Sequence, residues 1–294
     1  MQKIIKMSKN KSKNNDYIEI PKLLLIIAKV LSVISSKLTV LFVAKLFSTP
    51  IKYRIPKREL EMDAKSKQEL VFIPSIRKKV MIYHYGTSPK KILIIHGWSG
   101  RGTQLFKIAD ALLKSGYSTI SFDAPAHGKS SGNNTLMPEF IETILELENQ
   151  FGPFEAAIGH SLGGMSLLNA VKKGFQTNRL VLISSGDIVK DIIDDFIKKL
   201  NLKPRISDLF QQHLENKSNQ SIDDFSAYKV AKDIEIPTLI VHDENDNEVP
   251  VKCAIHIHKH LVNSEMIHTQ NLGHRKILGD KKVIDRILHF IYSQ

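Results

Sequence analysis

Cysteine is almost absent from this chain of 294 residues, which contains only Cys253. A single cysteine cannot form an intramolecular disulfide, and its isolation agrees with a reducing compartment. The 12 histidines do not form a metal-binding pattern either. His256 and His260 share one face of a predicted helix, but no further His, Cys or carboxylate cluster has the spacing of a zinc site. We therefore expect no metal site.

The sequence also lacks an uninterrupted apolar run that could cross a membrane. Residues 23–47 are strongly apolar, but Lys29, Lys37 and Lys45 interrupt them, and no uncharged run in this stretch exceeds seven residues. A spanning helix needs about 20 mostly apolar residues, and a lysine at mid-membrane costs about 2.5 to 3.5 kcal/mol on insertion scales. A single-span anchor is disfavoured, and so is a signal peptide, because lysine breaks the apolar core. We expect a cytoplasmic protein, with peripheral contact at the inner face of the membrane as the open alternative.

Acidic residues are scarce in the first 60 residues, which carry 13 Lys or Arg but only three Asp or Glu. This basic arm holds +10 of the formal net charge of +12, so the rest of the chain is close to neutral. Residues 1–15 contain five lysines and few apolar side chains, which predicts disorder. Aromatic residues do not alternate with the basic ones, and no nucleic-acid motif is present, so we expect no nucleic-acid partner.

Residues 22–47 of the basic arm predict an apolar helix with two alternative roles. In the first role, the helix would pack against the rest of the chain, with Lys29, Ser32 and Ser36 on its outer face. Alternatively it lies in an anionic membrane surface, where apolar burial and lysine attraction add. Packing is the favoured interpretation, and the membrane surface is the partner that stays open.

A strand-to-helix turn around Ser161 carries the clearest chemical signal. Residues 154–158 (FEAAI) predict a short buried strand, and residues 162–172 (LGGMSLLNAVK) predict a helix. Between them lies the sequence GHSLGG, which begins at Gly159 and whose glycines relieve the strain of a tight bend. The first N–H groups of the helix are free to face an anion. This context makes Ser161 a candidate nucleophile.

A serine hydroxyl needs a histidine to take its proton and an acid to orient that histidine. Candidates for both lie downstream. His274 lies in a loop after the predicted strand 265–269. A β-branched apolar run that opens at Pro237 ends in an acidic loop, which contains Asp243, Glu244 and Asp246. The pattern therefore offers one base and three candidate acids.

The order of these motifs resembles that of the α/β-hydrolase superfamily, and the resemblance covers residues 65–294. In that family the catalytic serine, acid and histidine follow successive strands of one sheet. The resemblance implies Ser161, Asp246 and His274 in these three roles. Such chemistry requires no metal ion and no organic cofactor.

The acid has the most alternatives of the three. The family pattern His-Gly-x-x-Asp aligns with His242 and Asp246, although Asp243 stands where the family has glycine. Asp246 is favoured on that alignment. Asp187 follows a predicted strand at residues 180–184, at the other position where some relatives carry the acid, and it stays an alternative.

The loop that follows the predicted strand 91–95 also resembles the family. It reads HGWSG from His96. By the resemblance, the backbone N–H of Trp98 is one oxyanion-hole donor, and that of Leu162, the residue after the nucleophile, is the other. Each such donor can lower the barrier by about 3 kcal/mol. Loop shape matters more than side-chain identity at these two positions.

A further resemblance lies in the sequence FDAPAHGKS, which begins at Phe122. It is similar to the family loop Asp-x-x-Gly-His-Gly-x-Ser, with Ala126 where the family often has glycine. His127 of this loop and His96 of the preceding one are expected to be structural. Arg101 either positions an acidic group of the substrate or begins a predicted helix at residues 103–114, as a solvated side chain.

Strands and helices alternate from about residue 91 onward, which predicts an α/β protein with a mainly parallel sheet covered by helices on both faces. Two earlier runs, residues 69–74 and 79–85, resemble antiparallel leading strands. The resemblance implies an α/β-hydrolase fold with a small helical cap. The expected parts are a basic arm with an apolar helix at 1–60, the α/β-hydrolase core at 61–185 and 236–294, and the cap at 186–235.

The cap is expected because the strand pattern lapses after residue 185. Residues 187–200 and 206–214 are amphipathic, which predicts two helices. Residues 215–224 are polar and predict a mobile loop. Caps of this kind commonly select substrates.

These patterns predict a serine hydrolase of the carboxylesterase type, which cleaves an ester or related acyl bond through an acyl-enzyme at Ser161. The expected partner is a small-molecule ester or acyl substrate. A peptidase or amidase with the same machinery is the alternative within enzymes. A noncatalytic, membrane-associated scaffold is the alternative from another class. Such scaffolds have usually lost a catalytic residue, whereas all three candidate residues are present here.

Overall fold

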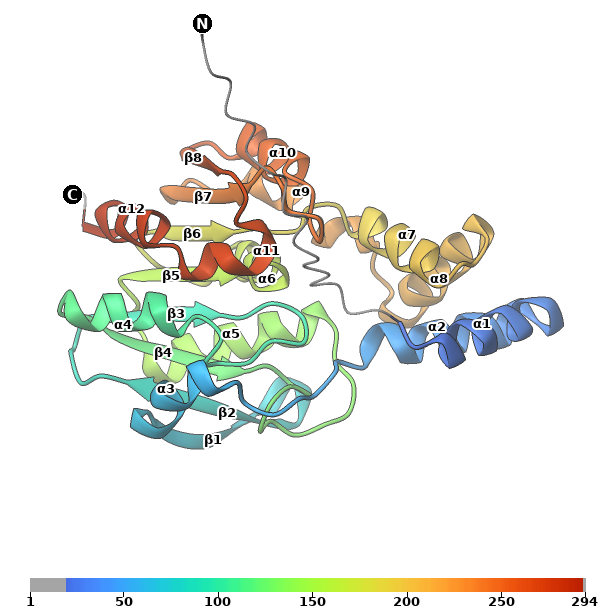
Figure 1. Cartoon of the computed structure of the whole chain (residues 1–294), viewed down its shortest axis with the longest axis horizontal. Helices are drawn as coiled ribbons and strands as arrows, with labels where there is room; N and C mark the ends of the chain where they lie inside the picture. The colour runs from blue at the N-terminus through green and yellow to red at the C-terminus, as the bar shows by residue number, and fades with distance from the viewer. Residues whose placement is uncertain (1–19, 293–294) are drawn as a thin grey trace, which may run out of the picture.

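One sheet of eight strands forms the centre of the computed structural model, which describes residues 20–292 (Figure 1). The strands are β1 (Lys67–Ile73), β2 (Lys78–Tyr85), β3 (Lys91–Ile95), β4 (Ser118–Asp123), β5 (Ala156–His160), β6 (Leu180–Ile183), β7 (Thr238–Asp243) and β8 (Ser264–Thr269). Their order across the sheet is β1-β2-β4-β3-β5-β6-β7-β8. Strand β2 pairs antiparallel with β1 and β4, and the other pairs are parallel. The predicted mainly parallel sheet and its antiparallel leading strands are confirmed.

Helices cover both faces of this sheet. One apolar cluster joins the sheet to α5 (Met137–Phe151), α6 (Leu162–Lys172), α9 (Ala227–Ala231) and α10 (Lys252–His260). A second cluster joins the opposite face to α3 (Leu60–Lys65), α4 (Phe106–Lys114) and α12 (Lys281–Tyr292). Every residue of β4, β5, β6 and β7 is buried. Parallel strands covered on both sides bury both faces and so tend to be continuous apolar runs, as β6 (LVLI) is, whereas β4 (STISFD) also buries polar side chains.

The apolar part of the basic arm forms two helices instead of the one that the sequence predicts. Helix α1 (Lys22–Ile34) ends and α2 (Ser36–Ser48) begins at Ser35, which has extended dihedral angles. The Ser35 side chain accepts a hydrogen bond from Leu38 N at 3.4 Å, so it caps the second helix. None of the helices within residues 20–292 has the length and apolar character needed to cross a bilayer. The disorder predicted for residues 1–15 concerns residues outside the described range.

The α1–α2 hairpin packs against the two helices between β6 and β7, which are α7 (Val189–Lys199) and α8 (Pro204–Ser218) (Figure 1). The ring centroids of Phe47 and Phe196 lie 5.2 Å apart, and those of Phe47 and Phe210 lie 5.3 Å apart. Of the residues expected on its outer face, Lys29 and Ser36 are exposed and Ser32 is half-buried. The hairpin and the α7–α8 pair therefore form one apolar cluster beside the sheet.

Two predicted helix boundaries are wrong. Helix α4 begins at Phe106, not at residue 103, because Gly102 and Thr103 form hydrogen bonds to side chains outside the helix. Helix α8 continues to Ser218, through part of the predicted mobile loop at residues 215–224. It ends where Asn219 takes a left-handed conformation with φ of 54°, which is a common helix ending.

Candidate active site

Ser161 occupies a tight turn between β5 and α6, as the sequence predicts. Its φ of 54° and ψ of −120° are dihedral angles that side chains rarely adopt. Other backbone atoms lie so close to the two positions that flank this turn that only glycine fits there. A Cβ at Gly159 would lie 2.6 Å from Gly163 O, and a Cβ at Gly163 would lie 2.6 Å from the carbonyl oxygens of Ile95 and His96. The turn therefore places the half-buried Ser161 just beyond the end of β5.

His274 lies in α11 (Gly273–Lys276), after β8, and contacts Asp246. Its Nδ1 donates a hydrogen bond to Oδ2 of Asp246 at 2.8 Å. The other carboxylate oxygen accepts the backbone N–H groups of Glu248 and Val249, each at 2.9 Å. Burial raises the pKa of Asp246, but the hydrogen bond from His274 and the backbone N–H groups outweigh it and hold the pKa below its usual value. Asp246 is thus ionised at neutral pH, and Nε2 of His274 is the ring atom that can accept a proton.

The other predicted acids have different partners. Asp243 accepts hydrogen bonds from Thr269 Oγ1 at 2.7 Å and from Leu272 N at 3.0 Å, so it ties β7 to the loop that carries His274. Glu244 is exposed and accepts a hydrogen bond from a glutamine. Asp187 contacts Nδ1 of His256 at 2.6 Å. Among the four candidates, Asp246 is the one that the fold brings to His274.

His160, next to the candidate nucleophile, holds the backbone of His274. Its Nε2 donates a hydrogen bond to His274 O at 3.0 Å, and the two ring centroids lie 4.6 Å apart. Burial and the neighbouring His274 lower the pKa of His160 well below its usual value. A neutral His160 therefore links the turn at Ser161 to the base.

Two buried histidines fix the loop that contains Trp98. His96 Nε2 accepts a hydrogen bond from Ala124 N at 2.9 Å, and His127 Nε2 accepts one from Ser99 N at 3.0 Å. Burial lowers the pKa of His96 to about 4, and burial together with His96 lowers that of His127 to about 3. Both rings are neutral at pH 7, and their predicted structural role is confirmed.

A cavity of about 270 Å³ opens beside Ser161. Ser161, His274 and Trp98 all line it, so the fold brings three of the predicted site residues together. Leu162 is adjacent to Ser161 as the first residue of α6, and Asp246 lies behind His274. Polar and charged side chains make up much of the remaining lining and include Tyr53, Arg58, Glu59, Arg101, Glu248 and Arg275. Among residues 20–292, no cluster of three or more His, Cys, Asp or Glu side chains could hold a metal ion.

Comparison with family models places most of the chain from β3 onward in one superfamily. Residues 90–201 match the model of the alpha/beta hydrolase fold, and residues 212–292 match that of TAP-like proteins. The chain belongs to the α/β-hydrolase superfamily. A search of curated proteins gave no match.

Solved structures of α/β-hydrolases share the architecture. A putative lipase from Acinetobacter baumannii AYE is 22% identical, with a TM-score of 0.61, over 81% of this chain and 96% of its own. An esterase from Exiguobacterium antarcticum is 18% identical, with a TM-score of 0.63, over 77% of this chain and 100% of its own. A bromoperoxidase from Bacillus anthracis is 18% identical, with a TM-score of 0.60, over 77% of this chain and 100% of its own. At such identities the likeness shows the fold alone.

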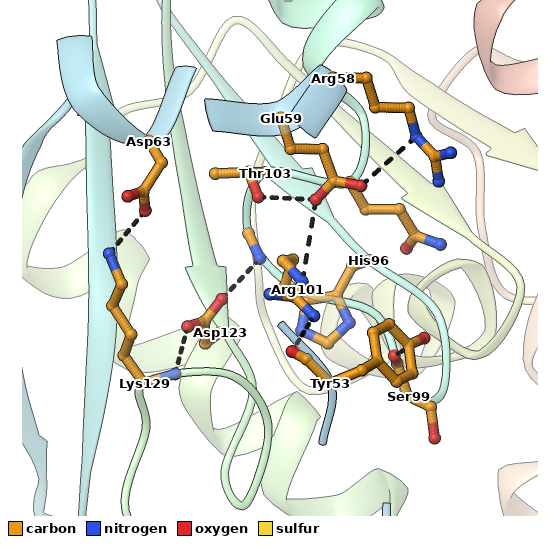
Figure 2. Close-up of polar contacts among 12 residues, drawn as sticks. Tyr53, Arg58, Glu59, Asp63, His96, Ser99, Arg101, Thr103, Asp123 and Lys129 are labelled. Carbon is orange, nitrogen blue, oxygen red and sulfur yellow. Dashed lines mark hydrogen bonds and ion pairs between the residues drawn. The ribbon is translucent and has the colours of Figure 1, made fainter. Parts of the chain in front are cut away.

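This α/β-hydrolase has a cluster around Arg101 that the sequence did not reveal (Figure 2). Arg101 is buried, with 5% of its surface exposed, which corrects the prediction of a solvated side chain or helix start. Its guanidinium donates to Tyr53 O at 2.7 Å and lies 3.8 Å from Glu59, which accepts a hydrogen bond from Thr103 at 2.9 Å. Burial raises the pKa of Glu59. Nothing local in the sequence marks this contact, because Glu59 and Arg101 lie 42 residues apart in the chain.

Tyr53 connects the same cluster to the loop that contains Trp98. Its hydroxyl donates a hydrogen bond to Ser99 O, and its ring lies 5.2 Å from the Arg101 guanidinium carbon. Ile51 N donates to Ser99 Oγ at 3.0 Å. The chain just after α2 thus clamps Ser99, whose φ of 54° is itself unfavourable for a serine.

The predicted loop after β4 closes around Asp123 (Figure 2). Its carboxylate accepts the backbone N–H groups of Gly102 at 2.8 Å and Lys129 at 2.7 Å. A Cβ at Gly128 would lie 2.1 Å from Asp123 Oδ2, which explains the glycine there. Ala126 has a φ of 66°, the left-handed conformation that suits the glycine often found in the family.

Proposed function

We propose that this protein is a serine hydrolase that cleaves carboxylic esters or related acyl bonds through an acyl-enzyme at Ser161. One observation carries the proposal. A strained serine and a histidine held by a buried carboxylate line the same cavity. These are the nucleophile, base and orienting acid that acyl transfer requires.

In the proposed first half-reaction, Ser161 Oγ attacks the carbonyl carbon of the substrate while its proton passes to Nε2 of His274. Asp246 stabilises the imidazolium that forms. The tetrahedral intermediate then collapses, the bond to the leaving group breaks, and His274 returns the proton to the leaving oxygen. The product is an alcohol, and the acyl group stays on Ser161 as an ester.

In the second half-reaction a water molecule attacks the acyl carbon of the Ser161 ester. His274 takes a proton from the water as the new bond forms and gives it back to Ser161 Oγ as the old bond breaks. The carboxylic acid leaves, and the resting state is restored. His274 performs every proton transfer in this scheme.

The backbone N–H groups of Trp98 and Leu162 are proposed to bind the oxyanion. Leu162 is the first residue of α6, where an N–H has no acceptor within its helix. The 97–98 backbone runs close to the nucleophile, since a Cβ at Gly97 would lie 2.9 Å from the Cβ of Ser161. Two such donors would stabilise developing negative charge by about 3 kcal/mol each.

The lining of the cavity suggests which segment contacts the substrate. Tyr53, Pro56 and Arg58, from the chain after α2, line the cavity, whereas no residue of 186–235 is among its lining residues. We therefore propose that residues 53–58 contact the bound ester directly. The segment 186–235, proposed as a cap, acts through its packing with the α1–α2 hairpin.

Turnover of p-nitrophenyl esters by the purified full chain tests the proposal. Ser161→Ala should lower kcat by about 10⁶-fold, the loss typical of a removed nucleophile. Ser166→Ala is the matched control, because Ser166 lies one turn further along α6 and hydrogen-bonds to Leu162 O at 2.8 Å instead of facing the cavity. A p-nitroanilide in place of the ester separates esterase from amidase activity. Equal turnover by the two serine variants would contradict the proposal.

A further inference from the structure

Helix α1 has an apolar face that no other part of residues 20–292 covers, formed by Leu23, Ile26, Val30, Val33 and Ile34. Between 51% and 83% of the surface of each residue is exposed. Their spacing of three and four residues places Leu23, Ile26, Val30 and Val33 on one side of the helix. Ala28, in contrast, is fully buried in the apolar cluster of the hairpin and the α7–α8 pair. Helix α1 thus has one packed face and one unpacked face.

Exposed positive charge accompanies this apolar face. Lys22, Lys29 and Lys37 are exposed, and none of them forms an ion pair with another of the residues described. The sequence contains no Asp or Glu from residue 20 to residue 58. An apolar stripe flanked by lysines, within a stretch of chain that has no Asp or Glu from residue 20 to residue 58, matches the surface of a helix that lies in an anionic lipid interface.

We propose that the α1 face binds the surface of an anionic lipid bilayer, with the helix lying in the plane of the interface. The apolar side chains would enter the boundary between headgroups and acyl chains, and the lysines would contact lipid phosphates. Helix α1 has 13 residues, so it is about 20 Å long. A bilayer core is about 30 Å thick, so the helix suits the interface and not a crossing.

A second copy of this chain fits the same face less well. A symmetric dimer built on it would bring identical lysines toward one another around the apolar patch, which costs free energy through like-charge repulsion. Lipid phosphates neutralise the same charges. The sign of the charge therefore favours an anionic membrane as the occupant.

The position of α1 would link membrane binding to the cavity. Helix α1 lies outermost in the hairpin and projects with it to one side of the sheet (Figure 1). The chain leaves the hairpin at Ser48 and, within five residues, reaches Tyr53, which lines the cavity and hydrogen-bonds to Ser99 O. Binding at α1 would hold this side of the enzyme near the membrane. The binding itself does not depend on the proposed hydrolase chemistry.

Sedimentation of the full chain with vesicles tests the proposal, using phosphatidylcholine alone and phosphatidylcholine mixed with phosphatidylglycerol. We expect binding to the anionic vesicles and little to the neutral ones. The double variant Ile26→Ser/Val33→Ser should lower partitioning by about tenfold or more, because apolar burial is lost. Leu70→Ser/Val262→Ser is the matched control, since these residues are 54% and 69% exposed elsewhere on the molecule, and it should bind like the wild type.

A charge variant separates the electrostatic contribution. Lys29→Gln/Lys37→Gln should weaken binding to anionic vesicles several-fold, whereas Lys259→Gln/Lys282→Gln, with lysines exposed on other helices, should not. Absence of vesicle binding by the wild type, or equal binding by Ile26→Ser/Val33→Ser, would overturn the proposal. So would a dimer, detected by light scattering, that these two serine substitutions dissociate while vesicle binding persists.

Discussion

At the residue scale, two buried aspartates each contact a histidine ring, at 2.8 Å for Asp246 and His274 and at 2.6 Å for Asp187 and His256. The resemblance to relatives made both aspartates candidates for the acid. Of the two histidines in these contacts, only His274, the partner of Asp246, lines the cavity together with Ser161. Burial raises the pKa of Asp187, whereas that of Asp246 is held below its usual value. Position in the fold therefore distinguishes the two carboxylates.

Asp246→Asn should lower kcat for ester hydrolysis by about 10³- to 10⁴-fold, because the histidine loses the carboxylate that sets its tautomer and stabilises its charged form. Asp187→Asn removes a carboxylate from an equivalent aspartate–histidine contact and should keep kcat within a few-fold of wild type. Steady-state kinetics of both variants checks this. A large loss in Asp187→Asn with full activity in Asp246→Asn would reverse the assignment.

The two buried histidines that fix the loop containing Trp98, His96 and His127, predict how stability depends on pH. The pKa of His127 is lowered to about 3, from about 6.5 in an unfolded chain. Below pH 6.5 the unfolded state therefore binds a proton that the folded state does not, and stability falls as the pH is lowered toward 4. The expected slope is about 1.4 kcal/mol per pH unit for each such histidine.

His127→Gln should flatten this dependence. Gln offers an amide oxygen near the place of Nε2, where His127 accepts Ser99 N, but it does not titrate. Urea unfolding between pH 6.5 and 4 should give a slope smaller than that of wild type by about 1.4 kcal/mol per pH unit. The slope of the unfolding free energy against pH is compared, and not its absolute value, because the substitution also changes packing by the same amount at every pH. Parallel curves for the two proteins would show that His127 is not the titrating group.

At the element scale, the segment after α2 acts as part of the site. Residues 51–59 contact the loop that carries Trp98 through Ile51, Tyr53 and Glu59, at sequence separations of 44 to 48 residues. We infer that these contacts hold the proposed oxyanion donor of Trp98 in place. Besides the contact with the ester proposed for residues 53–58, the Tyr53 hydroxyl then has a positioning role, which it performs through the loop.

Tyr53→Phe removes the hydrogen bond to Ser99 O and should lower kcat by between about two- and tenfold, the effect of losing about 0.5 to 1.5 kcal/mol. Tyr292→Phe is a close control, because the Tyr292 hydroxyl also donates to a serine carbonyl, that of Ser115, and both tyrosines are about half exposed. Both variants should lose similar stability in thermal unfolding. Only Tyr53→Phe should lose kcat, and equal kinetics in the two would contradict a positioning role.

Elements with a strong local pattern could be predicted from the sequence, and those set by distant contacts could not. Buried strands such as β6 and β7 read as apolar runs, and the turn at Ser161 was marked by its glycines. The break at Ser35 was missed because the apolar pattern continues through it. The buried Glu59 and Arg101 could not be paired from the sequence, because their contact depends on how the arm folds back over the sheet.

At the scale of the whole molecule, the chain combines an α/β-hydrolase sheet with a helical hairpin that packs against α7 and α8 (Figure 1). The motifs located the proposed nucleophile, base and acid because candidate catalytic residues of this fold follow strand ends in a fixed order. They could not locate the wall of the cavity, which comes partly from residues 53–58. The chain runs directly from the hairpin into residues 53–58 of the cavity wall. Residues 51 and 53 in turn contact the loop of Trp98. The arm is therefore integrated with the proposed site.

The most direct test of the central claim is labelling of the intact protein with a fluorophosphonate, followed by mass mapping of the modified peptide. We expect one adduct, on Ser161, which forms rapidly in wild type and Ser166→Ala. Ser161→Ala should show none, and His274→Ala should react far more slowly. An unlabelled but folded wild type, or an adduct on another serine, would contradict an acyl-enzyme at Ser161.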